Sequence, residues 1–189
     1  MDRPTPASVT DWNAADATRG VRHPGWITRF RMASKSQARA AMRAAGSVAV
    51  AEGEEPRLTN LATGLAERLG LATVDLFIHD KGGPNAMTGR VDGPFVSMAR
   101  PMVTTYTRTE LEAVIAHCLV RHRASVREWI PVGYADDVRA AALTRFPPAL
   151  VSAIRKAEPY QGRFAAFYLV ADGPTHRPVE ERAEALLDL

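Results

Sequence analysis

The stretch TRTELEAVIAHCLVRHR, residues 107–123, most constrains how this 189-residue chain can fold. Thr107 and Glu110 form the T-x-x-E pattern of a capping box, which marks the beginning of a helix. Behind them, apolar residues recur at steps of one, three and four: Leu111, Val114, Ile115 and Leu119. This spacing predicts a central helix with one buried side.

Two helices and a strand are predicted before this central helix. Helical periodicity covers residues 34–50 and residues 56–71, where leucines recur at steps of three and four and Gly70 supplies a C-terminal stop. Residues 72–80, ATVDLFIHD, alternate between apolar and polar side chains, as a half-buried strand does.

A β-hairpin is predicted next. NAMTGRV and FVSMA, residues 85–91 and 95–99, both read as short strands. Asp92 and Gly93 between them tolerate the positive φ angles that a tight hairpin turn requires.

The part of the chain after residue 123 predicts more helix than strand. Pro147 and Pro148 open one of these helices, at the position where proline is best tolerated. The predicted elements are helices over 134–143, 147–158 and 177–189 and an extended piece over 163–171. The whole pattern indicates an α+β fold, with a small mixed or antiparallel sheet packed on the central helix.

Composition indicates one domain preceded by a basic arm. With 46% hydrophobic residues the chain can bury a substantial core, and we expect a single domain over residues 34–189. Residues 1–43 hold eight Arg or Lys against three Asp, and we interpret residues 1–33 as a partly extended arm. We do not expect it to bind nucleic acid, because no nucleic-acid module accompanies the charge.

The composition also bears on location. No apolar run is long enough to span a membrane, and the N-terminus lacks the layout of a signal peptide, so we expect a cytoplasmic protein. The single cysteine, Cys118, excludes an internal disulfide and a zinc site built from several thiolates.

Four separated segments together resemble one family of enzymes. They are GLAERLGLATVDLFIHDKGGPNAMTGR, TRTELEAVIAHCLVRH, GYADDVRAAALT with PPALVSAIRKAE, and THRPVEERAEAL. In order and wording they resemble the zinc metallopeptidases that include CAAX prenyl proteases and HtpX-like proteases, together with their small soluble relatives, the minigluzincins. The resemblance covers about residues 57–189 and implies a zincin-like fold.

The resemblance also implies where the metal site of the family falls on this chain. His117 matches the first zinc-binding histidine, Cys118 the catalytic glutamate and Arg121 the second histidine of an HExxH motif. Gly133 matches the glutamate that is the third ligand, and Asp137 matches the aspartate that orients the first histidine. The HExxH motif is therefore degenerate here, and two of the three ligands are missing.

A peptide cleft is implied as well. The family's cleft has an edge strand on one side and a Thr-His-Pro-type segment on the other. The matching residues are Asn85, Ala86, Met87 and Thr88 on the strand, and Thr175, His176 and Arg182 on the other side. An edge strand can bind an extended peptide without any metal, so the implied partner is a peptide or protein.

The chemistry of the replaced residues argues against zinc. A catalytic zinc needs about three protein ligands and an open water position. Arg121 cannot serve, because a guanidinium keeps its proton and has no lone pair to donate. Cys118 is a poor replacement for the glutamate that takes a proton from the metal-bound water. We therefore expect no metal and no zinc cofactor.

Arg121 instead predicts an ion-pair network. We expect Arg121, His117 and Asp136 or Asp137 to form a charge-assisted cluster in place of the zinc. A shifted metal site that uses Cys118 and His122 with one of these aspartates is an alternative, but it would be rotated by about 100° around the helix. We expect Cys118 to pack as a small hydrophobe and His122 to lie on a solvated basic face.

Three functions remain open at this point. The first is a pseudopeptidase, a metal-free domain that keeps the cleft and acts as a binding or regulatory module. The second is an enzyme that reuses the cleft for chemistry without zinc, and the third is an active zinc peptidase with substituted ligands. The first would use the edge strand near residues 85–89, and the second would use His117, Cys118, Arg121 and Asp137. A catalyst should show a titratable group of perturbed pKa in a closed pocket, whereas a binding module should show an open groove.

Overall fold

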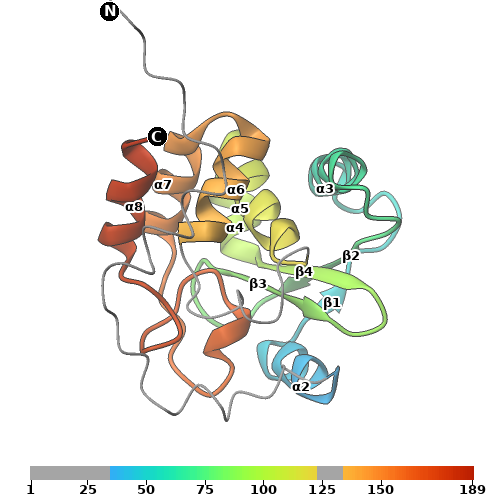
Figure 1. Ribbon diagram of the computed structural model, residues 1–189. Coiled ribbons are helices and arrows are strands. Elements are labelled where there is room, and N and C mark those ends of the chain that lie inside the picture. Colours follow the sequence, from blue (N-terminus) through green and yellow to red (C-terminus); the bar gives the residue numbers. More distant parts are fainter. Residues whose placement is uncertain (1–34, 123–133) are drawn as a thin grey trace, which may run out of the picture. The chain divides into compact units, whose positions relative to one another are not determined.

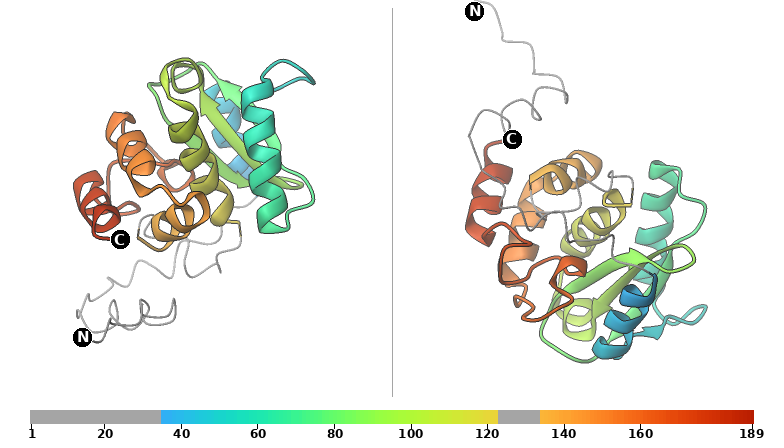
Figure 2. Two further views of the ribbon diagram at one scale, coloured as in Figure 1. Left: turned by 90° about the horizontal axis from the view of Figure 1, so that it is seen from above. Right: turned by 60° about the horizontal axis from the view of Figure 1, so that its bottom comes forward.

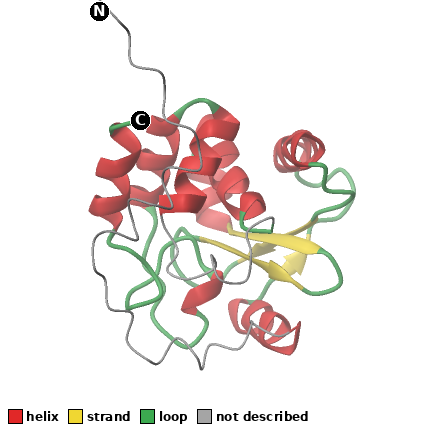
Figure 3. Cartoon of the chain, in the orientation of Figure 1, coloured by secondary structure: helices red, strands yellow, loops and turns green. Residues whose placement is uncertain are grey.

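The computed structural model describes residues 35–122 and 134–189, all of which belong to one unit, Ala33–Leu189. In chain order its elements are α2 (Lys35–Ala45), β1 (Val48–Ala49), α3 (Pro56–Leu69), β2 (Asp75–His79), β3 (Ala86–Arg90), β4 (Pro94–Ala99), α4 (Arg100–Thr105), α5 (Arg108–Val120), α6 (Tyr134–Thr144), α7 (Pro147–Lys156), the 3₁₀ helix η3 (Ala165–Phe167) and α8 (Val179–Leu187). They build the predicted α+β fold (Figure 1, Figure 3). The expected arm, residues 1–33, lies outside the described residues.

The sheet is small and mixed. Its strand order is β1-β2-β4-β3. The hairpin predicted around Asp92 and Gly93 is present, because β3 and β4 pair antiparallel with Arg90 opposite Pro94. β2 pairs parallel with β4, and β1 pairs antiparallel with β2. β3 therefore lies at one edge of the sheet.

Helices cover both faces of the sheet. α3 and α5 lie on one face and α2 lies on the other, as the two further views also show (Figure 2). β4 alternates accordingly: Phe95 packs in the cluster beside α2, while Val96 and Met98 pack in the larger core around α5. Because both faces are covered, β3 and β4 are buried along most of their length.

The helical predictions rest on local signals, and these signals are present in the structure. Leu58, Leu61 and Leu65 form the buried side of α3, and Gly70 ends that helix in the left-handed conformation, with φ 64°. Prolines open α7 as predicted. No helix among the described residues is long and apolar enough to cross a membrane.

The helix predicted over residues 34–50 is wrong in its second half. α2 ends at Ala45, and Gly46 follows with φ 70°, a conformation that glycine adopts readily. Val48 and Ala49 then form the short strand β1, whose residues pair with Ile78 and Phe77. The alanine and valine pattern of this segment is compatible with either state, and the glycine decides it.

The strand or extended piece predicted over residues 163–171 is wrong for its first part. Phe167 donates its N–H to Phe164 and Tyr168 donates to Ala165, so the chain closes into the 3₁₀ turn η3. Only isolated bridges follow, among them one between Tyr168 and Met87. The apolar run is buried, as a strand of this composition would be. Its first part forms local bonds, and from Tyr168 onward the backbone bonds to distant segments, such as Leu169 to Ala86.

Candidate functional site

The central helix α5 is fixed at its start by the capping box. The Thr107 hydroxyl accepts from the backbone N–H of Glu110 at 3.3 Å, and the Glu110 carboxylate accepts from the N–H of Thr107 at 2.8 Å. Glu110 also binds Ser152 and Lys156 of α7, each at 2.5 Å. The helix is thereby anchored at one end, and residues 110, 111 and 113–120 on it are buried.

Two buried side chains, His117 of α5 and Arg182 of α8, contact the buried carboxylate of Asp137 on α6. His117 Nδ1 lies 3.0 Å from Asp137 Oδ1. Arg182 donates to both carboxylate oxygens of Asp137 at 2.8 Å and to the carbonyl of Leu169 at 2.8 Å. Burial alone would raise the pKa of Asp137, but Arg182 and His117 outweigh it and hold that pKa well below its usual range.

Arg121 pairs with the neighbouring aspartate, Asp136. Its Nε lies 3.6 Å from Asp136 Oδ2, and its guanidinium donates to the carbonyl of Ala166 at 3.0 Å. Both side chains are buried. Burial lowers the pKa of Arg121 and raises the pKa of Asp136, and in each case the charge of the other residue opposes the shift.

The structure thus contains the network that the sequence predicts, in an extended form. Arg121 and His117 each have an aspartate, and the two aspartates are adjacent on α6. Arg182 is the partner that sequence reasoning missed, because the resemblance implied a place for it beside the cleft. A signal was available: Arg182 occupies the apolar face of α8, between Val179 and Leu186, where an arginine must find a buried partner.

His122 does not lie on a solvated face, which corrects the prediction for this residue. Its side chain is buried, its Nε2 lies 2.9 Å from the hydroxyl of Thr88, and its carbonyl accepts from Arg90 at 3.1 Å. The end of α5 packs on β3, so the residue just after the helix is covered. Burial lowers the pKa of His122 to about 4.

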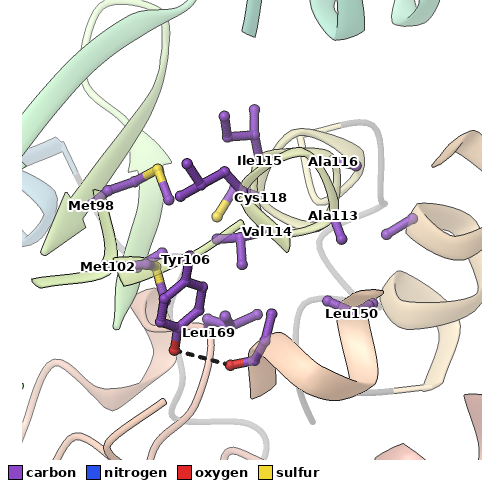
Figure 4. Close-up of a cluster of buried hydrophobic side chains, with 14 of the residues drawn as sticks. Met98, Met102, Tyr106, Ala113, Val114, Ile115, Ala116, Cys118, Leu150 and Leu169 are labelled. Atoms are coloured by element: carbon purple, nitrogen blue, oxygen red, sulfur yellow. Dashed lines mark hydrogen bonds between the residues drawn. The ribbon is translucent and has the colours of Figure 1, made fainter. Parts of the chain in front are cut away.

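Cys118 is the small buried hydrophobe that the sequence predicts. It lies among apolar side chains of the main core, close to Met98, Val114 and Ile115 (Figure 4). Burial raises the pKa of its thiol to about 12. A thiol in this state is neutral at physiological pH and is neither a nucleophile nor a metal ligand.

The expected edge of the cleft is occupied by the chain itself. The carbonyl of Ala86 accepts from the N–H of Leu169 at 2.8 Å, and Met87 bridges to Tyr168. Asn85 locks this arrangement, since its side chain donates to the carbonyls of Glu158 and Val170, both at 2.7 Å. An added peptide strand would have to displace residues 168–170 here.

The remaining residues expected at the cleft are buried too. Thr88 donates to the carbonyl of Phe95 at 2.9 Å. Thr175 bonds to Nδ1 of His176, whose Nε2 lies 2.8 Å from the carbonyl of Tyr168. Burial lowers the pKa of His176 to about 3, so the imidazole is neutral and structural in this conformation.

The residues present do not fit a zinc ion. One feature is compatible with a ligand, because Nε2 of His117 is buried and has no hydrogen-bond partner in the described part of the chain. Against it, Arg121, which the resemblance matches to the second ligand, is a cation, and Asp136 and Asp137 are paired with arginines. Gly133 lies outside the described residues. Among the described residues no group of three or more His, Cys, Asp or Glu is placed to hold a metal ion.

Comparisons with known proteins do not assign the chain to a family. No protein-family model matches it, and no curated protein matches it significantly. The site therefore has to be interpreted from its own geometry.

Proposed function

We propose that this domain is a metallopeptidase-like pseudoenzyme of zincin-like fold, in which an ion pair of the protein replaces the zinc site. It is a peptide- or protein-binding, regulatory module. The proposal depends on one observation: the buried guanidinium of Arg121 lies 3.6 Å from Asp136, on the helix that resembles the protease motif. A fixed cation at this position opposes a divalent metal and has no lone pair to offer it.

The state of Cys118 supports the absence of zinc-dependent hydrolysis. That reaction needs a metal-bound water of lowered pKa and a base that takes its proton. Cys118 matches the position of the base, but its thiol is buried in the apolar core with a pKa raised to about 12. Among the described residues matched to the family's site, none is suited to either part of this mechanism.

The proposed partner is an extended segment of peptide or protein. Such a segment adds to the edge of a sheet through main-chain hydrogen bonds, with no need of a metal. β3 is an edge strand, and residues 168–170 pair with its first residues. A bound peptide would replace residues 168–170 at the edge of β3. Whatever stabilises or releases this internal segment would therefore regulate peptide binding.

Zinc content tests the proposal. The purified chain is loaded with zinc, dialysed and analysed by mass spectrometry; we expect far less than one zinc per chain. The matched variant is Arg121→His, which removes the cation and supplies an imidazole at the same position. Zinc uptake by this variant alone would identify Arg121 as the cause.

The opposite result would favour the third function, a zinc peptidase with substituted ligands. The unpartnered Nε2 of His117 is the observation in its favour. Near-stoichiometric zinc in the native chain that is lost in His117→Ala would establish that function and end the pseudoenzyme proposal.

Peptide binding needs a separate test. Titration of the ¹⁵N-labelled chain with a mixture of unstructured peptides should shift the amide signals of residues 86–90 and 168–170 together. Signals that stay unchanged at millimolar peptide would exclude binding at this edge. An enzyme that reuses the cleft without zinc would instead show turnover of a substrate, and loss of that turnover in His117→Ala.

A further inference from the structure

A second polar region lies away from the ion-pair cluster and borders a cavity. The cavity has a volume of about 480 Å³, and its lining comes from the end of α2, residues 79–85, and residues 158–172. This volume falls within the roughly 300–1,000 Å³ of small-molecule sites. None of the residues matched to the metal motif lines it, although Asn85, which is matched to the cleft strand, does.

Three charged residues line the cavity, Lys81, Glu158 and Asp172, and the carboxylate of Asp172 accepts from the side chain of Gln161 at 2.9 Å. Lys81 and Glu158 both line it, and neither forms an ion pair with a described residue. Each side chain lies against a glycine: the stem of Lys81 would be 3.5 Å from a Cβ at Gly46, and the carboxylate of Glu158 would be 1.9 Å from a Cβ at Gly83. The glycines therefore leave room for both charged side chains at the cavity wall.

The rest of the lining combines an aromatic wall with a buried imidazole. Tyr160 stacks on Tyr168 with ring centroids 4.0 Å apart and an angle of 7° between the planes, and both line the cavity. His79 also lines it while being almost fully buried, and its Nδ1 lies 2.9 Å from the hydroxyl of Ser97.

The hydroxyl chain behind His79 lets the imidazole adapt to a ligand. The hydroxyl of Ser97 is also 2.9 Å from that of Ser47, and either oxygen can be the donor. If Ser97 donates to Nδ1, Nε2 of His79 carries the proton, and if Nδ1 donates to Ser97, Nε2 is an acceptor. The buried ring is thus able to present either a donor or an acceptor.

We propose that this cavity is a binding site for a free amino acid with an aromatic side chain. The α-carboxylate pairs with Lys81, the α-ammonium group pairs with Glu158, and the side chain packs on the wall formed by Tyr160 and Tyr168. A free amino acid fits better than a peptide end, because it carries both charges on one carbon atom and a peptide end carries only one. The site does not depend on whether the domain binds zinc. Tyr168 belongs both to this wall and to the segment that the proposed peptide would displace, so the amino-acid site exists in the conformation in which residues 168–170 pair with β3.

Three related ligands test the assignment on the native chain. Calorimetric titration compares L-tryptophan with tryptamine, which lacks the carboxylate, and with 3-indolepropionate, which lacks the ammonium group. We expect saturable binding of tryptophan and about tenfold weaker binding of each analogue, since each loses one charge-assisted contact. Equal affinity for all three ligands, or no saturable binding of tryptophan at millimolar concentration, would overturn the proposal.

Two variants assign the contacts. Lys81→Gln should weaken tryptophan and 3-indolepropionate while leaving tryptamine unchanged, and Glu158→Gln should do the reverse with the two analogues. Glu67→Gln, an exposed residue of α3 on the other face of the sheet, is the matched control and should change nothing. Variants that lower all affinities equally, or none, contradict the proposed contacts.

The ligand series also keeps the two proposals distinct. Circular dichroism of each variant shows whether it is folded, and the comparison of ligands on the native chain does not depend on any variant. Zinc in the native chain would end the pseudoenzyme proposal without changing these affinities. Absence of tryptophan binding would end the amino-acid proposal without bearing on zinc.

Discussion

The molecule contains two groups of charges that are arranged in opposite ways. In the cluster between α5, α6 and α8, Arg182 pairs with Asp137 at 2.8 Å and Arg121 lies 3.6 Å from Asp136, all of them buried. At the cavity beside α2, Lys81 and Glu158 remain exposed and do not pair with a described residue. In the first group each cation has a carboxylate partner. In the second group a cation and a carboxylate are both available to a ligand.

This difference separates charges that hold the fold from charges that can bind a ligand. A buried charge whose partner is removed leaves the other charge uncompensated, which costs about 3–5 kcal/mol. An exposed charge is hydrated and can exchange water for a ligand at little cost. The cluster should therefore matter for stability and the cavity for binding, and each variant below tests one side of this division.

The largest expected effect is on Arg182. Arg182→Met removes both bonds to Asp137 and should lower the free energy of unfolding by about 3–5 kcal/mol, measured by urea denaturation. Arg155→Met is the matched control, because Arg155 pairs with Glu180 on the surface and its loss should have a far smaller effect. Similar losses in both variants would contradict the structural role of the cluster.

Acid should destabilise the domain through its buried histidines. The folded-state pKa of His122 is lowered to about 4 and that of His176 to about 3, both by burial. The stabilisation from the neutral form is complete above about pH 6.5, the unfolded value, and is lost as the pH falls toward the folded pKa. Each histidine should remove about 1.4 kcal/mol per pH unit below 6.5.

Denaturation at pH values between 7.5 and 4.5 measures this slope. His176→Gln should lower the slope by about a third, because three buried histidines contribute to it about equally. His79, whose pKa burial lowers to about 4, contributes with the same sign. A stability that does not change between pH 6.5 and 4.5 would show that these histidines are not buried in the folded protein.

Arg121 should matter less than Arg182 for stability. Its contact with Asp136 is longer, and the pKa of Asp136 is already raised by burial, so this carboxyl can take up a proton once the arginine is lost. Arg121→Met should lower the free energy of unfolding by about 1–3 kcal/mol. The loss should shrink at lower pH, where Asp136 is protonated, and a loss that is independent of pH would exclude this ion pair.

The smallest expected effects come from two glycines. A Cβ at Gly83 would lie 1.9 Å from Glu158 Oε2 and 2.8 Å from its Cβ, so Gly83→Ala should displace this side chain and cost about 1 kcal/mol. Gly64 lies within α3 with nothing within 4 Å of its Cβ position, and Gly64→Ala should stabilise by about 0.5–1 kcal/mol. Thermal unfolding distinguishes the two variants, because the melting temperature should fall for Gly83→Ala and rise for Gly64→Ala.

The local features of the fold could be predicted because their causes are local. The capping box at Thr107 and Glu110 defines the start of α5 whatever packs against it. Gly70 likewise ends α3 in the left-handed conformation. The turn at Asp92 and Gly93 is also present, although neither residue has the positive φ that was expected of it. These elements appear where the sequence predicts them.

The features that failed depend on distant partners. The segment RFAAFYLVA reads as a strand, yet its backbone forms a 3₁₀ turn and covers the edge of β3. His122 reads as part of a basic surface, but Thr88 of β3 meets it. In both cases the sequence shows whether the side chains are apolar or polar. It does not show which distant residues they will contact.

The sequence by itself determined most of the helices, the hairpin, and the place of Arg121 at the end of the central helix, since each follows from residue type and spacing along one segment. Only the tertiary structure decided which aspartate each of Arg121 and Arg182 would meet, and that Lys81 and Glu158 would line one cavity without pairing. The reason is physical: propensity and capping act within a few residues, whereas the energy of a charge depends on burial and on partners that the fold brings together from distant segments.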